Sequence, residues 1–103
     1  MAFLKVLTLD QLPPDSAAEV MIGGFPVALC HAGGEVHAMW GRCPHQGGPL
    51  GYGTINGESV ACPWHGWEFS CATGRNDFDP NCRVQTYPVK IENGNILVDV
   101  ESA

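Results

Sequence analysis

Two short runs of the sequence combine a cysteine with a histidine: Cys43-x-His45 and Cys62-x-x-His65, with sixteen residues between His45 and Cys62. Each run offers one thiolate and one imidazole, and both groups are ligands for iron or zinc. A [2Fe–2S] cluster in which two histidines replace two cysteines on one iron needs this set of donors. We therefore predict that Cys43 and Cys62 bind one iron of such a cluster and that His45 and His65 bind the other.

The residues that follow each run favour tight loops. Gly47 and Gly48 come after the first run, and Gly66 comes after the second. Glycine lets the backbone approach closely and adopt positive φ, so that N–H groups can point at sulfur. Pro44 and Pro63, each directly after a cysteine, restrict the backbone in these turns. The cluster is expected to clamp together two loops that are distant in the sequence.

The mixed ligand set also predicts the redox behaviour. Two thiolates, two sulfides and two ferric irons sum to a charge of about zero when both imidazoles are neutral, whereas four thiolates leave about −2. Adding an electron to the neutral site is easier. The potential therefore rises from about −400 mV toward the range of about −150 to +300 mV, and we expect a carrier of single electrons.

The stretches on either side of these loops have the pattern of short β-strands joined by glycine turns. No stretch of 11 residues shows a convincing apolar period of 3.6, and only Asp10–Ala17 could hold a helical turn. The predicted strands are Phe3–Leu9, Ala18–Ile22, Phe25–His31, Glu35–Trp40, Gly53–Ile55, Ser59–Ala61, Glu68–Ser70, Gln85–Glu92 and Asn95–Val100.

These elements predict an all-β fold in a single domain of residues 1–103. An antiparallel β-sandwich base is formed by residues 1–40 and 83–103, from both ends of the chain. A small cluster-binding subdomain, about residues 41–82, is inserted between them.

Composition limits the kind of partner. The formal net charge is −6 with only 5 Lys and Arg, so nucleic acid is a poor partner and a protein with a basic docking face is a better one. No segment approaches the roughly 18 apolar residues of a membrane span, and residues 1–10 have no signal-peptide pattern. We expect a cytoplasmic monomer. Five cysteines in a cytoplasmic protein indicate metal binding or free thiols in preference to disulfides.

Several other residues have a structural or a functional interpretation. Cys30, Cys71 and Cys82 are expected to be packing residues or semi-exposed thiols, with a Cys71–Cys82 disulfide as the alternative. For His31 and His37 we expect surface or hydrogen-bonded roles.

Trp64 and Trp67 either pack in the core and loops or form an apolar shield and docking contact near His65. Gln46, Pro49 and Leu50 either rim the exposed edge of the cluster or are simple loop residues. Glu68, Asp77 and Asp79 are either solvated charges or contacts for a protein partner.

The motif C-x-H-x16-C-x-x-H resembles that of the Rieske-type ferredoxins that serve bacterial aromatic-ring-hydroxylating oxygenases. The similarity extends to Cys62–Phe69, Ala72–Gly74 and Thr86–Glu92, and spans Glu35 to Val100. It implies the Rieske fold and a soluble shuttle in aromatic hydrocarbon breakdown. Such a shuttle takes one electron from an NAD(P)H-dependent flavin reductase, passes it to a terminal oxygenase and is not itself an enzyme. In the family another loop covers the cluster, here Asp77–Cys82.

The chain also departs from the respiratory Rieske proteins that it resembles. Their disulfide between the cluster loops corresponds to Gly48 and Trp64, which cannot form one. Their serine and tyrosine hydrogen-bond donors correspond to Trp67 and Phe69. Because lost donors disfavour the more negative reduced state, the resemblance predicts a potential in the lower part of the Rieske range.

Two other classes of function stay open at this point. The chain could be a fixed Rieske subunit of a larger redox complex, such as the small subunit of a nitrite reductase. It could also be an interaction module stabilised by zinc, because the same four side chains are zinc ligands.

Overall fold

The computed structural model describes residues 3–44, 47–64, 66–76 and 82–100. These residues form ten strands and two short 3₁₀ turns, with no α-helix among them. The strands are β1 (Leu4–Thr8), β2 (Ser16–Ile22), β3 (Phe25–Ala32), β4 (Glu35–Trp40), β5 (Thr54–Asn56), β6 (Ser59–Ala61), β7 (Glu68–Ser70), β8 (Thr86–Tyr87), β9 (Val89–Glu92) and β10 (Asn95–Val98). The 3₁₀ turns are η1 (Leu9–Gln11) and η2 (Leu50–Tyr52). The all-β prediction is confirmed. The structure holds no helix of the length and apolarity that a membrane crossing requires within these described residues.

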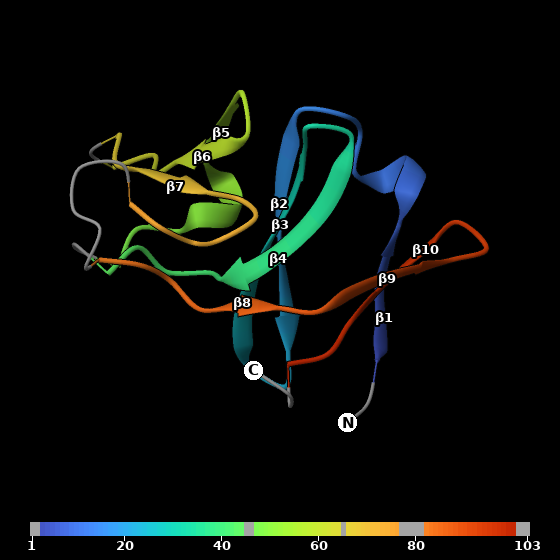
Figure 1. The fold of residues 1–103 in the computed structure, drawn as a ribbon. Helices are drawn as coiled ribbons and strands as arrows, with labels where there is room; N and C mark the ends of the chain where they lie inside the picture. The colour runs from blue at the N-terminus through green and yellow to red at the C-terminus, as the bar shows by residue number, and fades with distance from the viewer. Residues whose placement is uncertain (1–2, 45–46, 65, 77–81, 101–103) are drawn as a thin grey trace.

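The strands form three antiparallel sheets (Figure 1). One has the order β1-β10-β9 and joins the two ends of the chain; the second has the order β2-β3-β4-β8. The third, β5-β6-β7, is built from the middle of the sequence and lies to one side of the other two in Figure 1. This arrangement agrees with a two-sheet base and a small inserted unit.

One predicted strand is two strands in the structure. Gln85–Glu92 is interrupted at Pro88: β8 pairs with β4, whereas β9 pairs with β10 in the other sheet. Proline has no N–H group, so it cannot continue the ladder as a donor. Its carbonyl instead accepts a hydrogen bond from the Asp99 N–H at 3.1 Å. Pro88 is thus the point at which the chain passes from one sheet of the base to the other.

The four-stranded sheet separates two hydrophobic cores. The first core, next to the loops of the inserted unit, contains Ala28, Cys30, Ala32, Met39, Cys43, Leu50, Val60, Cys62, Phe69, Cys71 and Val84. The second core, between the two base sheets, contains Leu12, Val27, Leu29, Ala38, Tyr87, Ile96 and Val98. Because side chains alternate along a strand, β3 contributes to both cores. That explains why its sequence is apolar almost throughout instead of alternating.

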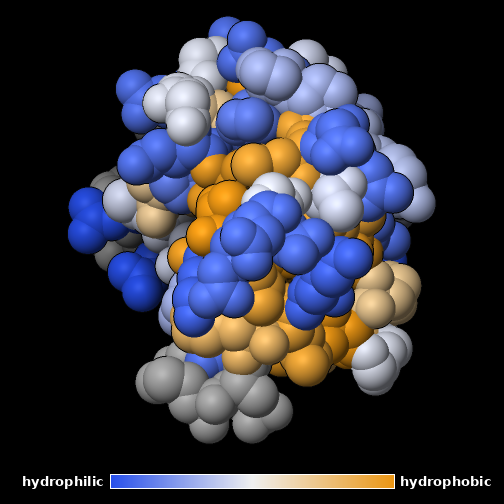
Figure 2. Space-filling view, turned by 90° about the vertical axis from the view of Figure 1, so that its right-hand side faces the viewer, coloured by the Kyte–Doolittle hydropathy of each residue, from blue (hydrophilic) through white to orange (hydrophobic). Residues whose placement is uncertain are grey.

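The side of the molecule that carries β1, β9 and β10 has a mixed surface. Figure 2 shows apolar residues emerging between polar ones there. The short β9 strand is largely exposed, and Lys90 pairs with Glu92 along it at 2.9 Å. Lysine and glutamate on an exposed strand discourage pairing with another chain. The charged residues on β9 therefore favour contact of this side of the base with solvent.

Candidate iron–sulfur site

The first cysteine loop is a closed backbone turn. The N–H group of Cys43 donates to the Gly48 carbonyl at 2.8 Å, and the N–H group of Gly47 donates back to the Cys43 carbonyl at 2.7 Å. Gly47 has a φ of 77°, a conformation that side chains with a Cβ rarely adopt. The predicted positive φ of a glycine in this loop is confirmed, whereas the predicted N–H contacts with sulfur stay a prediction.

The second cysteine loop repeats the same pattern. The N–H group of Cys62 donates to the Trp67 carbonyl at 2.7 Å, and the N–H group of Gly66 donates to the Cys62 carbonyl at 2.9 Å. Gly66 has a φ of 73°, close to that of Gly47. Two loops far apart in the sequence therefore present their cysteines in the same local geometry.

The two loops pack directly against each other. A Cβ added at Gly48 would lie 2.5 Å from Cys62 Sγ and 3.2 Å from Trp64 Cγ. The backbone of the first loop thus touches the sulfur of the second. Cys43 and Cys62 are both buried in the first core, with 2% and 3% of their surface exposed. These two buried thiols, one on each of two facing loops, form one half of the predicted ligand set.

The structure does not test the two histidines of the predicted ligand set. His45 and His65 lie outside the described residues, as do Gln46, Asp77 and Asp79. Within residues 3–44, 47–64, 66–76 and 82–100, no three His, Cys, Asp or Glu side chains converge to hold a metal ion. The assignment of the two histidines as ligands therefore stays a prediction.

Comparison with known proteins decides the family. The model of the Rieske [2Fe-2S] domain matches residues 2–88. The chain belongs to the Rieske [2Fe-2S] family. Its ligand pattern and the facing cysteine loops fit the [2Fe–2S] group, since Gly48 leaves room for the Cys62 sulfur that a side chain would fill.

Relatives that the chain matches over nearly their whole length are ferredoxin components of dioxygenase systems. The chain is 32% identical to the ferredoxin component of the naphthalene 1,2-dioxygenase/salicylate 5-hydroxylase systems of Ralstonia sp., over 96% of each chain. It is also 32% identical to the biphenyl dioxygenase ferredoxin subunit of Pseudomonas sp. (strain KKS102), covering 100% of this chain and 96% of the relative. A solved complex of reduced oxygenase and oxidized ferredoxin in carbazole 1,9a-dioxygenase contains a similar chain. That chain superposes with a TM-score of 0.84 at 28% identity, covering 93% of this chain and all of that one.

The Rieske loops rest on the base through close contacts. Arg42, directly before Cys43, forms an isolated antiparallel β-bridge with Pro49 through the backbone. Its Nη1 group donates to Glu19 Oε1 on β2 and to the Gly41 carbonyl, the latter at 3.1 Å. The Glu19 side chain is only 11% exposed, against 35% for Arg42. This ion pair ties the first cysteine loop to the four-stranded sheet.

We expect Arg42→Met to lower the free energy of unfolding by about 2 kcal/mol, because it leaves the Glu19 carboxylate buried without its cation. In a domain of this size, that corresponds to a fall of about 10 °C in the thermal midpoint. The measurement is thermal unfolding of the iron-loaded protein at a fixed scan rate.

Lys90→Met is the control for this variant. Lys90 pairs with Glu92 where both side chains are half-exposed, and it also lies over the Phe3 ring at 5.5 Å. Such surface contacts contribute about 1 kcal/mol or less. Equal losses in the two variants would contradict the anchoring role of Arg42.

Aromatic residues around the second loop differ in exposure. Trp64 is 56% exposed, although its ring lies against Gly48. Packing alone therefore does not explain why this position holds a tryptophan. Trp67 packs partly buried against the first core, and Phe69 is fully buried in it. Leu50 is also fully buried, which contradicts the interpretation that it rims the cluster and agrees with the alternative that it only packs in the loop. It packs inside because η2 lies over β2 and β3.

The remaining cysteines form a pair that sequence reasoning missed. Cys71 and Cys30 on β3 lie in the same core, and the influence of one thiol on the other lowers the pKa of Cys71 and raises the pKa of Cys30, whereas the disulfide considered was with Cys82. Cys30 and Cys71 are fully buried and Cys82 partly so, which agrees with packing roles. No local signal marks the pair, because Cys30 lies on β3, Cys71 lies in the turn after β7, and the two are distant in the sequence.

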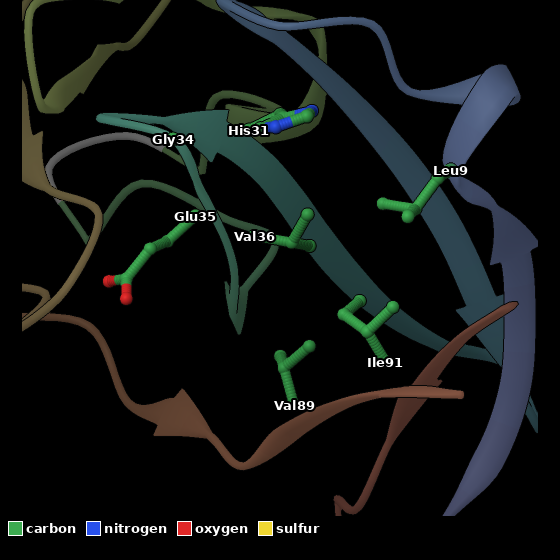
Figure 3. A pocket seen from close by; sticks show the side chains of 7 residues that line it. All are labelled: Leu9, His31, Gly34, Glu35, Val36, Val89 and Ile91. Carbon is green, nitrogen blue, oxygen red and sulfur yellow. The ribbon is translucent and has the colours of Figure 1, made fainter. Parts of the chain in front are cut away.

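The two described histidines have hydrogen-bonding or ionic partners, as expected. His31 Nδ1 lies 2.8 Å from the Leu12 carbonyl oxygen, and His37 Nε2 lies 3.8 Å from Glu35 Oε2. Both belong to the base. His31 also borders a cavity of about 420 Å³ (Figure 3). Its other lining residues are Leu9, Gly34, Glu35, Val36, Val89 and Ile91, none of which belongs to the cysteine loops.

Proposed function

We propose that this chain is the one-electron carrier of a multicomponent oxygenase system. It takes electrons from an NAD(P)H-dependent flavin reductase and delivers them to a terminal Rieske non-haem iron oxygenase. It is an electron-transfer component and not an enzyme. The observation that carries the proposal is the end-to-end match with ferredoxin components of dioxygenase systems, in a chain whose two cysteine loops meet.

Within this function each predicted ligand has a role. Cys43 and Cys62 hold one iron, and His45 and His65 hold the other. The [2Fe–2S] group supplies the one-electron couple when bound. The chain itself buries the two thiolates in the first core and shapes each loop through paired backbone hydrogen bonds. We further propose that residues 41–82 act as the cluster-binding unit on a base of residues 1–40 and 83–103.

The partner surface is proposed around the second loop. Trp64 exposes more than half of its surface next to Gly48, and an aromatic side chain there can anchor a protein contact. The net charge of −6 favours a partner with a basic docking face. Since the NAD(P)H that feeds the reductase is held inside the cell, we assign the carrier to the cytoplasm.

A reconstituted chain of electron transfer tests this function. The iron-loaded protein is mixed anaerobically with NADH and a flavin-dependent ferredoxin reductase, and its visible absorbance is followed; an oxidised Rieske oxygenase is then added. We expect bleaching in the first step and recovery in the second. A zinc-loaded sample is the control. A protein that is bleached by dithionite but not by the reductase would contradict the shuttle.

The size of the native protein in solution distinguishes a free electron shuttle from a fixed subunit of a larger complex. A free carrier elutes near its chain mass of 11.0 kDa on size exclusion of native extract. Elution within a larger complex that resists salt would favour the fixed Rieske subunit.

The midpoint potential is a separate prediction. The side chains of Phe69 and Trp67 cannot supply the hydroxyl donors that respiratory Rieske proteins place at the corresponding positions. We therefore expect a midpoint below about 0 mV, in the lower part of the range of about −150 to +300 mV. Redox-titrated EPR at pH 7 measures it. Phe69→Tyr is expected to raise the value, and a wild-type midpoint well above 0 mV would show that the missing donors do not set it.

A further inference from the structure

The base has a cavity beside the point where the chain passes from one of its sheets to the other. On β4, only Ala38 and Met39 pair with β8, because after Pro88 the chain continues as β9 and pairs with β10 in the other sheet. β9 therefore diverges from the first residues of β4. Residues from the start of β4 and from β9 line the cavity of about 420 Å³ (Figure 3). The cavity is thus a consequence of the strand order.

Most of the lining of this base cavity is apolar. Figure 3 shows four aliphatic side chains, from η1, β4 and β9, turned toward the same space: Leu9, Val36, Val89 and Ile91. The first three also pack against the second core, whereas Ile91 is 44% exposed. Ile91 therefore presents apolar surface to water at the mouth of the cavity. A ligand with an apolar body would remove that surface from water.

His31 lines the cavity and has one ring nitrogen bonded to the protein. Its Nδ1 lies 2.8 Å from the Leu12 carbonyl oxygen, and since a carbonyl can only accept, Nδ1 carries the proton of this bond. In the neutral imidazole Nε2 is then an acceptor. Within the part of the chain that the structure describes, nothing pairs with Nε2. The ring therefore offers an acceptor to a ligand that donates a hydrogen bond.

The charge at the cavity disfavours an anion. Glu35 lines it with a side chain that is 77% exposed and that lies 3.8 Å from His37. In Figure 3 the Glu35 carboxylate points away from the aliphatic side chains. No lysine or arginine is among the described residues that line the cavity, and the whole chain has a net charge of −6. A neutral ligand therefore fits better than a carboxylate or a phosphate.

The volume limits the size of the ligand. In another protein, an engineered apolar cavity of about 150 Å³ binds benzene. A cavity of about 420 Å³ therefore has room for one aromatic ring or two fused rings. A rigid ring system also loses little conformational freedom on binding, which favours it over a flexible chain of the same size.

We propose that the base carries a binding site for a neutral aromatic molecule of one or two rings that bears a hydroxyl group, as phenols and naphthols do. The hydroxyl group donates to Nε2 of His31, and the rings contact the aliphatic side chains. The lining residues are all outside the cysteine loops, so binding does not require the cluster or the carrier function.

Methyl NMR of the iron-loaded protein tests the position of the site. 2-Naphthol is titrated into ¹³C-methyl-labelled protein at pH 7.5. We expect saturable shifts of the Val36, Val89 and Ile91 methyl signals, with a dissociation constant below about 1 mM. Ile91→Ala should weaken binding about fivefold, because it removes apolar contact at the mouth.

Leu4→Ala is the matched control for Ile91→Ala. Leu4 lies in the same sheet and is also 44% exposed, but it does not line the cavity. It is expected to bind 2-naphthol as the wild type does. Shifts that do not saturate, or equal weakening in the two variants, would place 2-naphthol outside this cavity and overturn the proposal.

Two further compounds test the ligand chemistry. Quinoline has two fused rings without a hydroxyl donor, and 2-naphthoate carries a carboxylate instead. The wild type should bind 2-naphthol about fivefold more tightly than either. His31→Asn keeps an N–H group for the Leu12 carbonyl but removes Nε2, so the preference for 2-naphthol over quinoline should disappear. If that variant keeps the preference, or the wild type binds 2-naphthoate as tightly as 2-naphthol, the assigned ligand class is wrong. These readouts do not depend on electron transfer to an oxygenase.

Discussion

Cys43→Ala and Cys62→Ala are each expected to retain less than about one-tenth of the wild-type iron, because each removes one of two thiolates assigned to the same metal. The loss should also destabilise the fold, since cluster binding contributes folding free energy. Iron content and visible absorbance of the purified variants are the measurements.

The chain supplies its own matched controls for these two variants. Cys30 and Cys71 belong to the same core as Cys43 and Cys62, and all four have 3% or less of their surface exposed. Cys30→Ala and Cys71→Ala therefore lose a similar buried sulfur but no assigned ligand. They are expected to keep near-wild-type iron. Equal iron loss in all four variants would show that core packing, and not ligation, accounts for the effect.

Gly48→Ala has the second-largest expected effect. The new Cβ would lie 2.5 Å from Cys62 Sγ, whereas ordinary contacts begin at about 3.4 Å. The loop cannot retreat freely, because the Gly48 carbonyl accepts the Cys43 N–H bond. Overpacking of this kind costs about 1–3 kcal/mol, and the displaced sulfur should lower iron content at least about tenfold.

Gly57→Ala is the control for the glycine variant. Gly57 lies in the turn between β5 and β6 in the same part of the fold, and a Cβ there meets nothing within 4 Å. Its φ of 64° makes alanine unfavourable by about 1–2 kcal/mol. We expect a modest fall in the thermal midpoint with full iron content. If Gly48→Ala instead binds iron as Gly57→Ala does, the loops do not need their close approach.

Sequence reasoning succeeded where the signal was local. Glycine turns fixed the hairpins, and Glu35–Trp40, Ser59–Ala61 and Glu68–Ser70 have the predicted bounds. The two cysteine loops were expected because Gly47 and Gly66 follow their cysteines at spacings that close a turn. These features depend on a few neighbouring residues, whose backbone preferences are strong.

What sequence reasoning missed depends on distant contacts. Pro88 divides a run that looked continuous, because its two halves pair with strands of different sheets. Leu50 is apolar enough for a rim or a core, and only the packing of η2 on β2 decides for the core. The presence of Cys30 and Cys71 in one core likewise depends on how two sheets are placed relative to each other. None of these arrangements leaves a pattern in neighbouring residues.

The central claim is that two imidazoles and two thiolates hold one [2Fe–2S] cluster. Pulsed EPR of the reduced, iron-loaded protein labelled with ¹⁵N-histidine tests it most directly. Of the 4 histidines in the chain, two are predicted to couple to the unpaired electron, and His31→Gln or His37→Gln should leave both couplings unchanged. A reduced protein with no histidine nitrogen coupling, or with no EPR signal after iron and sulfide reconstitution, would contradict the account.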